Sequence, residues 1–357
     1  MKRLVLHIGV ENTASTYLQQ TFANSRDALR SAGVLYPHAP GETNHIKLAA
    51  FAMDDARGDE IRIMAGIRSP GDAAGLKADF LGELAREVSE CGCDAILLSN
   101  EHCSSRLIHE NDVRRLRDLL APLAETITIV VYLRRQDEAM LSMHSTAVRS
   151  GSAQPLGFPS EHVIAARFDY EKLLQRWAIV FGKENIVARL FNHLHNSNIL
   201  DDFAAAAALP ADIGWSEPEE PLNTRLDARQ AEYLRILNAF LPNVGDKNHL
   251  ARRGNLSDVV SKVKDPGPPL GLPPDMAKEI LERMRASNGA VAREYFGREL
   301  PGDPLFGEVH IPQAAEPYEM TLEEFAKTTA EIWALKHKQS RYLLHRLKEA
   351  LKAQDES

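Results

Sequence analysis

The sequence predicts an α/β fold, with a mostly parallel central sheet, helices on both of its faces and a C-terminal helical subdomain. In the first half of the 357-residue chain, short apolar runs alternate with segments of helical spacing. After residue 209 the alternation stops, and helical segments follow one another. Runs that are apolar throughout are typical of strands buried on both faces, as in parallel sheets.

The apolar runs predict strands at residues 3–9, 33–36, 94–99, 126–133 and 185–190. Helical spacing predicts helices at 15–31, 76–90, 111–120, 137–150, 170–181 and 199–208, whereas residues 38–75 are expected to be irregular. Ligands bind at the carboxyl ends of parallel strands. We therefore expect the functional residues just after the first, third and fourth strands.

The rest of the chain predicts helices at 227–241, 275–296 and 321–352, of which the last is long, charged and amphipathic. We divide the chain into a core at 1–209, a helical continuation packed on the core at 210–315 and a C-terminal amphipathic helix at 316–357. The last helix either docks on the rest of the chain, which is the simpler expectation, or mediates a homo-oligomer.

The composition of the chain disfavours several classes of function. The formal net charge of −8 disfavours a general nucleic-acid binder. Cys91 and Cys93 are too close for a typical disulfide, and with Cys103 they do not complete a zinc site, so we expect free thiols and no metal. No apolar run approaches the ~20 residues that span a bilayer, and the N-terminus is typical of a first strand rather than a signal peptide. These features predict a cytoplasmic protein with no membrane span.

The segment LVLHIGVENTASTYLQ, at residues 4–19, has the layout of a phosphate-binding loop: a strand, a short turn and a helix start. In this interpretation the backbone N–H groups of Thr13, Ala14, Ser15 and Thr16 hold an anion, aided by the helix dipole. The alternative is that Thr13 and Ser15 are ordinary N-cap residues. The Walker A spacing of glycines and lysine is absent, which disfavours a plain ATP or GTP hydrolase.

A second segment, YLRRQDEAMLSMHSTAVRSG at residues 132–151, places Arg134 at the end of a strand and Ser142 eight residues later on the next helix. An arginine at a strand end can bind a phosphate in bidentate fashion, and a helix serine can add a further hydrogen bond. The alternative is a solvated arginine and a serine on the helix surface.

Together, HIGVENTASTYLQ and VVYLRRQDEAMLS resemble the bacterial sulfotransferases that use 3′-phosphoadenosine 5′-phosphosulfate, a family with a P-loop fold. The similarity continues in YEKLLQRWAIVFGKENIVARLF and covers roughly residues 3–300. The resemblance implies that the loop of Thr13 to Thr16 holds the 5′-phosphosulfate, that Arg134 and Ser142 bind the 3′-phosphate, and that no metal is needed. The loop with Arg252 and Arg253 is similar to one that closes over the nucleotide in some members.

The chain departs from the family pattern at two positions. Asn12 stands where the family has a lysine, and Ala14 where it has a glycine. An asparagine can hydrogen-bond the leaving oxygen but supplies no full charge, and losing one such contact typically costs about 3–4 kcal/mol of transition-state stabilisation. Either another cation, such as Lys47 or Arg135, replaces the lysine, or the enzyme is slow, or it binds nucleotide without turnover. The substitution at Ala14 matters if the loop needs a positive φ there.

Sulfuryl transfer to a hydroxyl needs a base. Glu101 and His102 follow the third strand, and the resemblance implies that a glutamate or a histidine has this role; Glu101 is our first choice. The alternative is that Glu101 caps a helical turn and His102 lies on the surface. His45 and Lys47 are expected to contribute to an acceptor pocket, whereas His7, within the first strand, is expected to be a core residue.

The sequence therefore predicts a sulfotransferase whose acceptor, by family analogy, is a carbohydrate hydroxyl. The alternative is a nucleotide-binding protein of the same fold that has lost catalysis with the lysine. A kinase-like phosphotransferase is disfavoured, because the Walker lysine and a magnesium-binding aspartate after a strand are both missing.

Overall fold

The computed structural model describes residues 2–219, 226–241, 254–263, 267–311 and 318–355. The chain divides into two compact units built from interleaved stretches. The first unit comprises residues 1–140, 158–223 and 277–311, and the second comprises 141–157, 224–276 and 312–357. The predicted division of the chain into three consecutive parts, with boundaries at residues 209 and 315, stays a prediction.

The first unit contains a five-stranded sheet in the order β2-β3-β1-β4-β5. Its strands are β1 Arg3–His7, β2 Val34–Leu35, β3 Ala95–Ser99, β4 Thr126–Leu133 and β5 Ile186–Leu190. All neighbouring strands are parallel. Strand β1 lies in the middle, and the chain leaves it first toward β2 and β3 on one side and then toward β4 and β5 on the other. The predicted α/β fold with a parallel sheet is confirmed.

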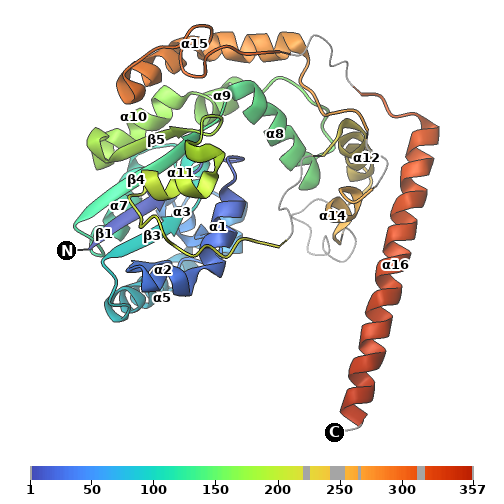
Figure 1. Cartoon of the computed structure of the whole chain (residues 1–357), viewed down its shortest axis with the longest axis horizontal. Helices are drawn as coiled ribbons and strands as arrows, with labels where there is room; N and C mark the ends of the chain where they lie inside the picture. Colours follow the sequence, from blue (N-terminus) through green and yellow to red (C-terminus); the bar gives the residue numbers. More distant parts are fainter. Residues whose placement is uncertain (1, 220–225, 242–253, 264–266, 312–317, 356–357) are drawn as a thin grey trace. The chain divides into compact units, whose positions relative to one another are not determined.

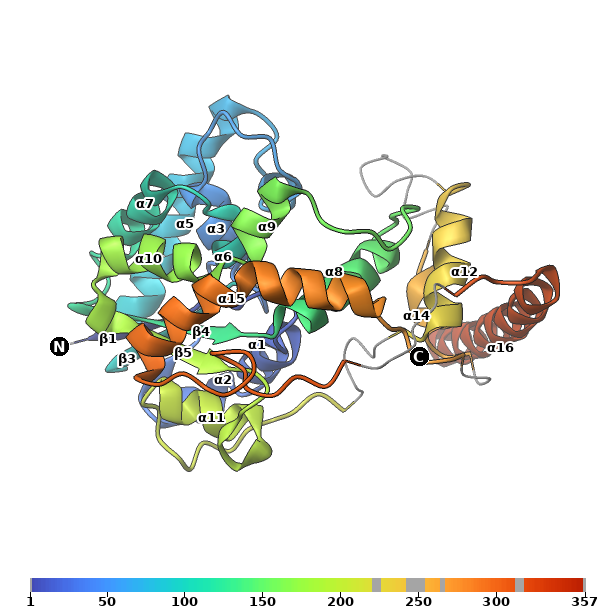
Figure 2. The ribbon, with the colours of Figure 1, turned by 90° about the horizontal axis from the view of Figure 1, so that it is seen from above.

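Helices cover both faces of this sheet (Figure 1 and Figure 2). One face packs against α1 Ser15–Asn24, α2 Arg26–Ser31 and α11 Ile199–Ala206. The other packs against α3 Ile46–Ala52, α5 Pro70–Glu90, α7 Glu110–Leu120 and α10 Tyr170–Phe181. Alternate residues of β1 point to opposite faces, so that Val5 joins the first cluster and Leu4 and Leu6 the second.

Two longer helices, α8 Gln136–Arg149 and α15 Pro274–Phe296, have residues in both units. The remaining elements of the first unit are short. The short elements are α4 Glu60–Met64, α6 His102–Arg106, α9 Glu161–Arg167, η1 Lys183–Asn185 and η2 His195–Ser197. None of the helices in the described ranges is long and apolar enough to cross a membrane.

Two expectations about the helices were wrong. The predicted helix at 15–31 is interrupted at Ser25, whose hydroxyl accepts a hydrogen bond from the Ser216 N–H (2.8 Å), a contact that sequence periodicity cannot reveal. Residues 38–75 are not irregular, since they contain α3, α4 and the start of α5. Pro70 begins α5 rather than breaking the chain, because proline suits the first helical position, and Ser69 and Asp72 form a capping box there.

The second unit contains the end of α8, α12 Ala228–Asn238, α14 Leu256–Val260 and α16 Leu322–Asp355. Its small core gathers Val148, Tyr233, Leu234, Val260 and Ile332, one or more from each of these four helices.

Candidate functional site

The loop between β1 and α1 folds tightly. Asn12 and Ala14 both have left-handed backbones, with φ of 67° and 60°. The Thr13 side chain is buried and its hydroxyl donates to the Val10 carbonyl (2.6 Å), so it closes the loop instead of facing a ligand. The first helical hydrogen bond runs from the Leu18 N–H to the Ala14 carbonyl (3.0 Å). The preceding N–H groups of α1 thus have no acceptor within the helix.

The hydroxyls at the start of α1 suit an anion. Ser15 is buried, and its Oγ has no hydrogen-bond partner among the described residues, whereas Thr16 is exposed. A buried hydroxyl without a partner at the positive end of a helix is a donor available for a phosphate or sulfonate oxygen. The side chains present therefore fit the anion that the resemblance implies.

Arg134 connects the two segments that carry the resemblance. It follows β4, and its Nη1 donates to the Asn12 carbonyl (2.7 Å). Its Nε lies 3.3 Å from a Glu138 carboxylate oxygen, and its guanidinium lies 5.4 Å from the centre of the Phe191 ring. Ser142 lies further along α8, in the second unit. The joint action of Arg134 and Ser142 on one phosphate stays a prediction, and Arg252 and Arg253 lie outside the described residues.

Glu101 lies two residues after the end of β3, beside the end of β1. A Cβ placed on Gly9 would be 2.8 Å from the Glu101 Cβ, so the glycine permits this close approach. Glu101 precedes α6, but its side chain makes no cap hydrogen bond. Instead the carboxylate accepts hydrogen bonds from Gln19 Nε2 (2.7 Å) and Asn44 Nδ2 (3.0 Å). Two amide donors thus orient the carboxylate.

His102 and Glu11 form an ion cluster next to Glu101. The ring nitrogens of His102 lie 3.5 Å from a Glu11 oxygen and 3.7 Å from a Glu101 oxygen. Burial by itself lowers the pKa of His102, but the contact with Glu11 and the charges of both carboxylates raise it overall. Burial would raise the pKa of Glu11, yet His102, Arg167 and Arg106 hold it well below its usual range. His102 is thus partly buried and favours the protonated form, rather than lying on the surface.

The cations that contact the loop are not the ones expected. Lys47 donates to the Ala39 carbonyl (2.8 Å), and Arg135 pairs with Asp137 (2.7 Å) and Glu138 (3.2 Å). The loop is contacted instead by Arg134, as described above, and by two arginines that bind Glu11. These are Arg106, at 3.1 Å, and Arg167.

A hydrogen-bonded chain runs from the Glu101 carboxylate into the sheet. Gln19 Nε2 also lies 3.2 Å from the Ser99 hydroxyl, which is 2.8 Å from His7 Nδ1. His7 is buried, as expected for a core residue. His45 is also buried and binds the Ser99 N–H through Nδ1 (3.2 Å), so it does not line a pocket; its neighbour Asn44 is the residue that reaches Glu101.

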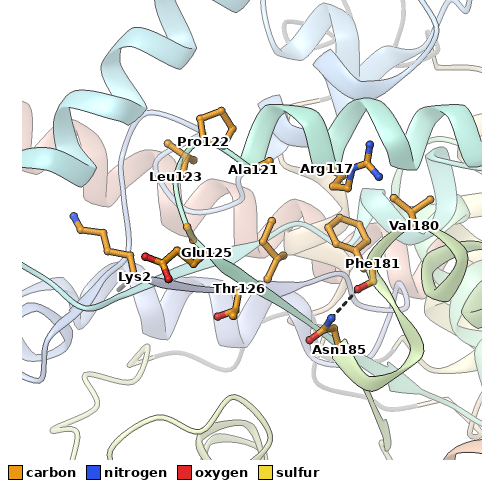
Figure 3. Close-up of a pocket in the computed structure, with 12 residues that line it drawn as sticks. Lys2, Arg117, Ala121, Pro122, Leu123, Glu125, Thr126, Val180, Phe181 and Asn185 are labelled. Atoms are coloured by element: carbon orange, nitrogen blue, oxygen red, sulfur yellow. Dashed lines mark hydrogen bonds between the residues drawn. The ribbon is translucent and has the colours of Figure 1, made fainter.

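Two of the cavities formed by the described residues lie beside the sheet. The larger, of 690 Å³, lies where the strands begin, beside Lys2 and Thr126 (Figure 3), and so at the opposite edge from the loop. The smaller, of 440 Å³, is lined by Ser105, Arg106 and Arg167, which all contact Glu11, and also by Arg57, Asp59, Glu60 and His162. Only the smaller one adjoins the ion cluster of Glu11 and His102. Among the described residues, no group of three or more His, Cys, Asp or Glu is arranged to hold a metal ion.

The chain is similar to solved structures, but not to any family model or curated protein. Among solved structures, the chain is similar to a sulfotransferase from Alicyclobacillus acidocaldarius, with 14% identity, a TM-score of 0.46 and coverage of 83% of this chain and 96% of that one. It is also similar to the sulfotransferase domain from the curacin biosynthetic pathway, with 12% identity, a TM-score of 0.34 and coverage of 80% and 98%. Both are sulfotransferases, as the sequence resemblance implied.

Proposed function

We propose that the protein is a sulfotransferase that moves a sulfuryl group from 3′-phosphoadenosine 5′-phosphosulfate to a hydroxyl of a carbohydrate. The contact that supports this most directly is the hydrogen bond from Arg134 to the Asn12 carbonyl (2.7 Å). It joins the two segments of the resemblance, 122 residues apart, where the central parallel strands end. Ligands of parallel α/β sheets bind at this edge.

In this proposal the N–H groups of Thr13 to Thr16 bind the 5′-phosphosulfate, and Arg134 binds the 3′-phosphate. The acceptor oxygen forms a bond to sulfur while the bond from sulfur to the phosphate oxygen breaks, which releases 3′-phosphoadenosine 5′-phosphate. Glu101 accepts the hydroxyl proton as the new bond forms. Because its raised pKa favours the protonated ring, His102 is the second choice for the base.

The 440 Å³ cavity supports a carbohydrate acceptor. The charged side chains Arg57, Asp59, Glu60 and Arg106 line it, and no Phe, Tyr or Trp is among the lining residues. Guanidinium groups and carboxylates in one wall offer donors and acceptors for several hydroxyls at once.

The donor site is tested by calorimetric titration with 3′-phosphoadenosine 5′-phosphate, with ADP and ATP as controls. We expect binding that needs the 3′-phosphate and weakens about 10- to 100-fold in Arg134→Ala, as for a lost hydrogen bond to a charged group. Arg135→Ala is the matched control, because Arg135 pairs with Asp137 and Glu138. Equal binding of all three nucleotides, or none, would refute the donor assignment.

The second candidate is a nucleotide-binding protein without turnover, which Asn12 favours. Asn12→Lys separates the two functions, with Asn12→Gly as the control that keeps the left-handed backbone without a charge. If the catalytic groups are in place, lysine should raise turnover by a factor of about 100 to 1000. Nucleotide binding without any gain in turnover would favour the non-catalytic protein.

A further inference from the structure

The long helix α16 has a packed first half and an exposed second half. In the first half, Ile332 is buried in the core of the second unit, and the Phe325 ring lies 5.0 Å from that of Tyr233. From residue 337 to residue 346 every residue is exposed. Leu343 and Leu344 are among them, with 59% and 57% of their surface in contact with solvent.

The exposed half is amphipathic. Leu343 lies five helical turns after Phe325, so the apolar stripe that packs against the core continues beyond it. Measured from the direction midway between Leu343 and Leu344, Lys338 lies about 170° around the axis, whereas Arg341, Arg346 and Lys348 lie about 90–110° away, at the borders of the apolar face. Two leucines unprotected from water on an otherwise regular helix point to a surface that binds something.

The charge of this segment is opposite to that of the chain. Residues 336–349 contain five Lys or Arg and one Glu, whereas residues 321–335 contain three Glu and one Lys, and the chain as a whole has a net charge of −8. A partner for this half of α16 must therefore be acidic as well as apolar.

We infer that the exposed half of α16 binds the surface of an anionic phospholipid membrane, lying along the interface with its leucines among the upper acyl chains. An apolar face bordered by Lys and Arg is a pattern of interfacial helices, and anionic headgroups attract clustered Lys and Arg. Two other partners fit less well. A second copy of the chain that pairs over the same segment would bring two basic stretches together, and a nucleic acid would leave the leucines in contact with water. This inference is independent of the proposed catalytic activity.

Co-sedimentation of the full chain with vesicles tests it, using phosphatidylcholine alone or mixed with phosphatidylserine. We expect binding to the mixed vesicles and much weaker binding to phosphatidylcholine alone. Replacing Lys338, Arg341 and Lys348 by Gln should weaken binding on the order of 100-fold, since each cation near the surface contributes roughly fivefold.

Replacing Leu343 and Leu344 by Ser should abolish vesicle binding, because the apolar contact is lost. Replacement of Ile63 and Met64 by Ser is the matched control: these residues are also exposed, at 65% and 71%, but lie on α4, and the change should leave binding intact.

Three outcomes overturn the inference. One is equal binding, or no binding, to the two vesicle types. Another is an equal loss in the α4 control. The third is a dimer, seen by analytical ultracentrifugation, that the Leu343 and Leu344 replacements dissociate while the unaltered chain ignores vesicles, which would assign the face to a second copy. Far-ultraviolet circular dichroism establishes that each variant remains folded.

Discussion

Replacing Ala14 with glycine should stabilise the protein, although it removes a methyl group. Ala14 has φ of 60° and ψ of 19°, a left-handed conformation in which Cβ crowds the neighbouring carbonyl. This crowding costs an ordinary residue about 1–2 kcal/mol. Glycine also loosens the unfolded chain, which offsets about 0.4–1 kcal/mol. We expect a net gain in the free energy of unfolding of about 0.5–1 kcal/mol.

Urea unfolding with an independent melting curve measures the gain, which corresponds to about 1–4 °C in Tm. Ala208→Gly is the matched control, because Ala208 also has a positive φ, of 48°, but lies beyond α11, away from the loop. Both glycine variants should be stabilised, and nucleotide affinity should change only in Ala14→Gly. Ala49→Gly, within α3, should lose at least about 1 kcal/mol. If Ala14→Gly is destabilised as Ala49→Gly is, the loop is not strained at position 14.

The remaining predictions concern Gly9 and two buried histidines. Gly9→Ala combines a positive φ with a Cβ 2.8 Å from that of Glu101, so it should lower the free energy of unfolding by about 2–5 kcal/mol. Gly33→Ala is the control, because Gly33 has a similar φ of 76° but open space around it, and it should cost about 1–2 kcal/mol. Equal losses for the two variants in urea unfolding would contradict the close approach. Burial lowers the pKa of His7 and of His45 from 6.5 to about 3. Because the unfolded chain then takes up protons that the folded chain does not, these two histidines should together lower the free energy of unfolding by about 2–3 kcal/mol from pH 6 to pH 5. The raised pKa of His102 acts in the opposite direction, so the test uses His102→Gln, in which unchanged urea midpoints over that interval would refute the prediction.

The sequence was sufficient for the elements whose stability is local. The uninterrupted apolar runs predicted the strands, and the spacing of Tyr170–Phe181 predicted α10 with the bounds that the structure has. Short helices escaped prediction, because one or two turns give no clear period; α6 and α9 have only five and seven residues. Pro70 was interpreted as part of an irregular segment, whereas in the structure it begins α5.

In the candidate site, too, some residues could be predicted from the sequence and others could not. Glu101 and His102 were predictable, because a polar residue after a buried strand must lie at the edge of the sheet. Gln19 and Asn44 were not, because the contacts that orient the Glu101 carboxylate span 82 and 57 residues of sequence. Arg167 reaches Glu11 over 156 residues and had no motif of its own.

Asn12 occupies a position where backbone and charge make opposite demands. Its φ of 67° is a conformation that asparagine adopts more readily than lysine, so in the proposed sulfotransferase an asparagine here suits the loop but supplies no cation. The cations around the loop do not simply replace that charge: Arg134 contacts the Asn12 carbonyl, and Arg106 is paired with Glu11. A lysine at position 12 would regain the charge but lie next to the Glu11 carboxylate and in a strained backbone. Both effects reduce its benefit, so the gain in turnover for Asn12→Lys should lie nearer 100-fold than 1000-fold.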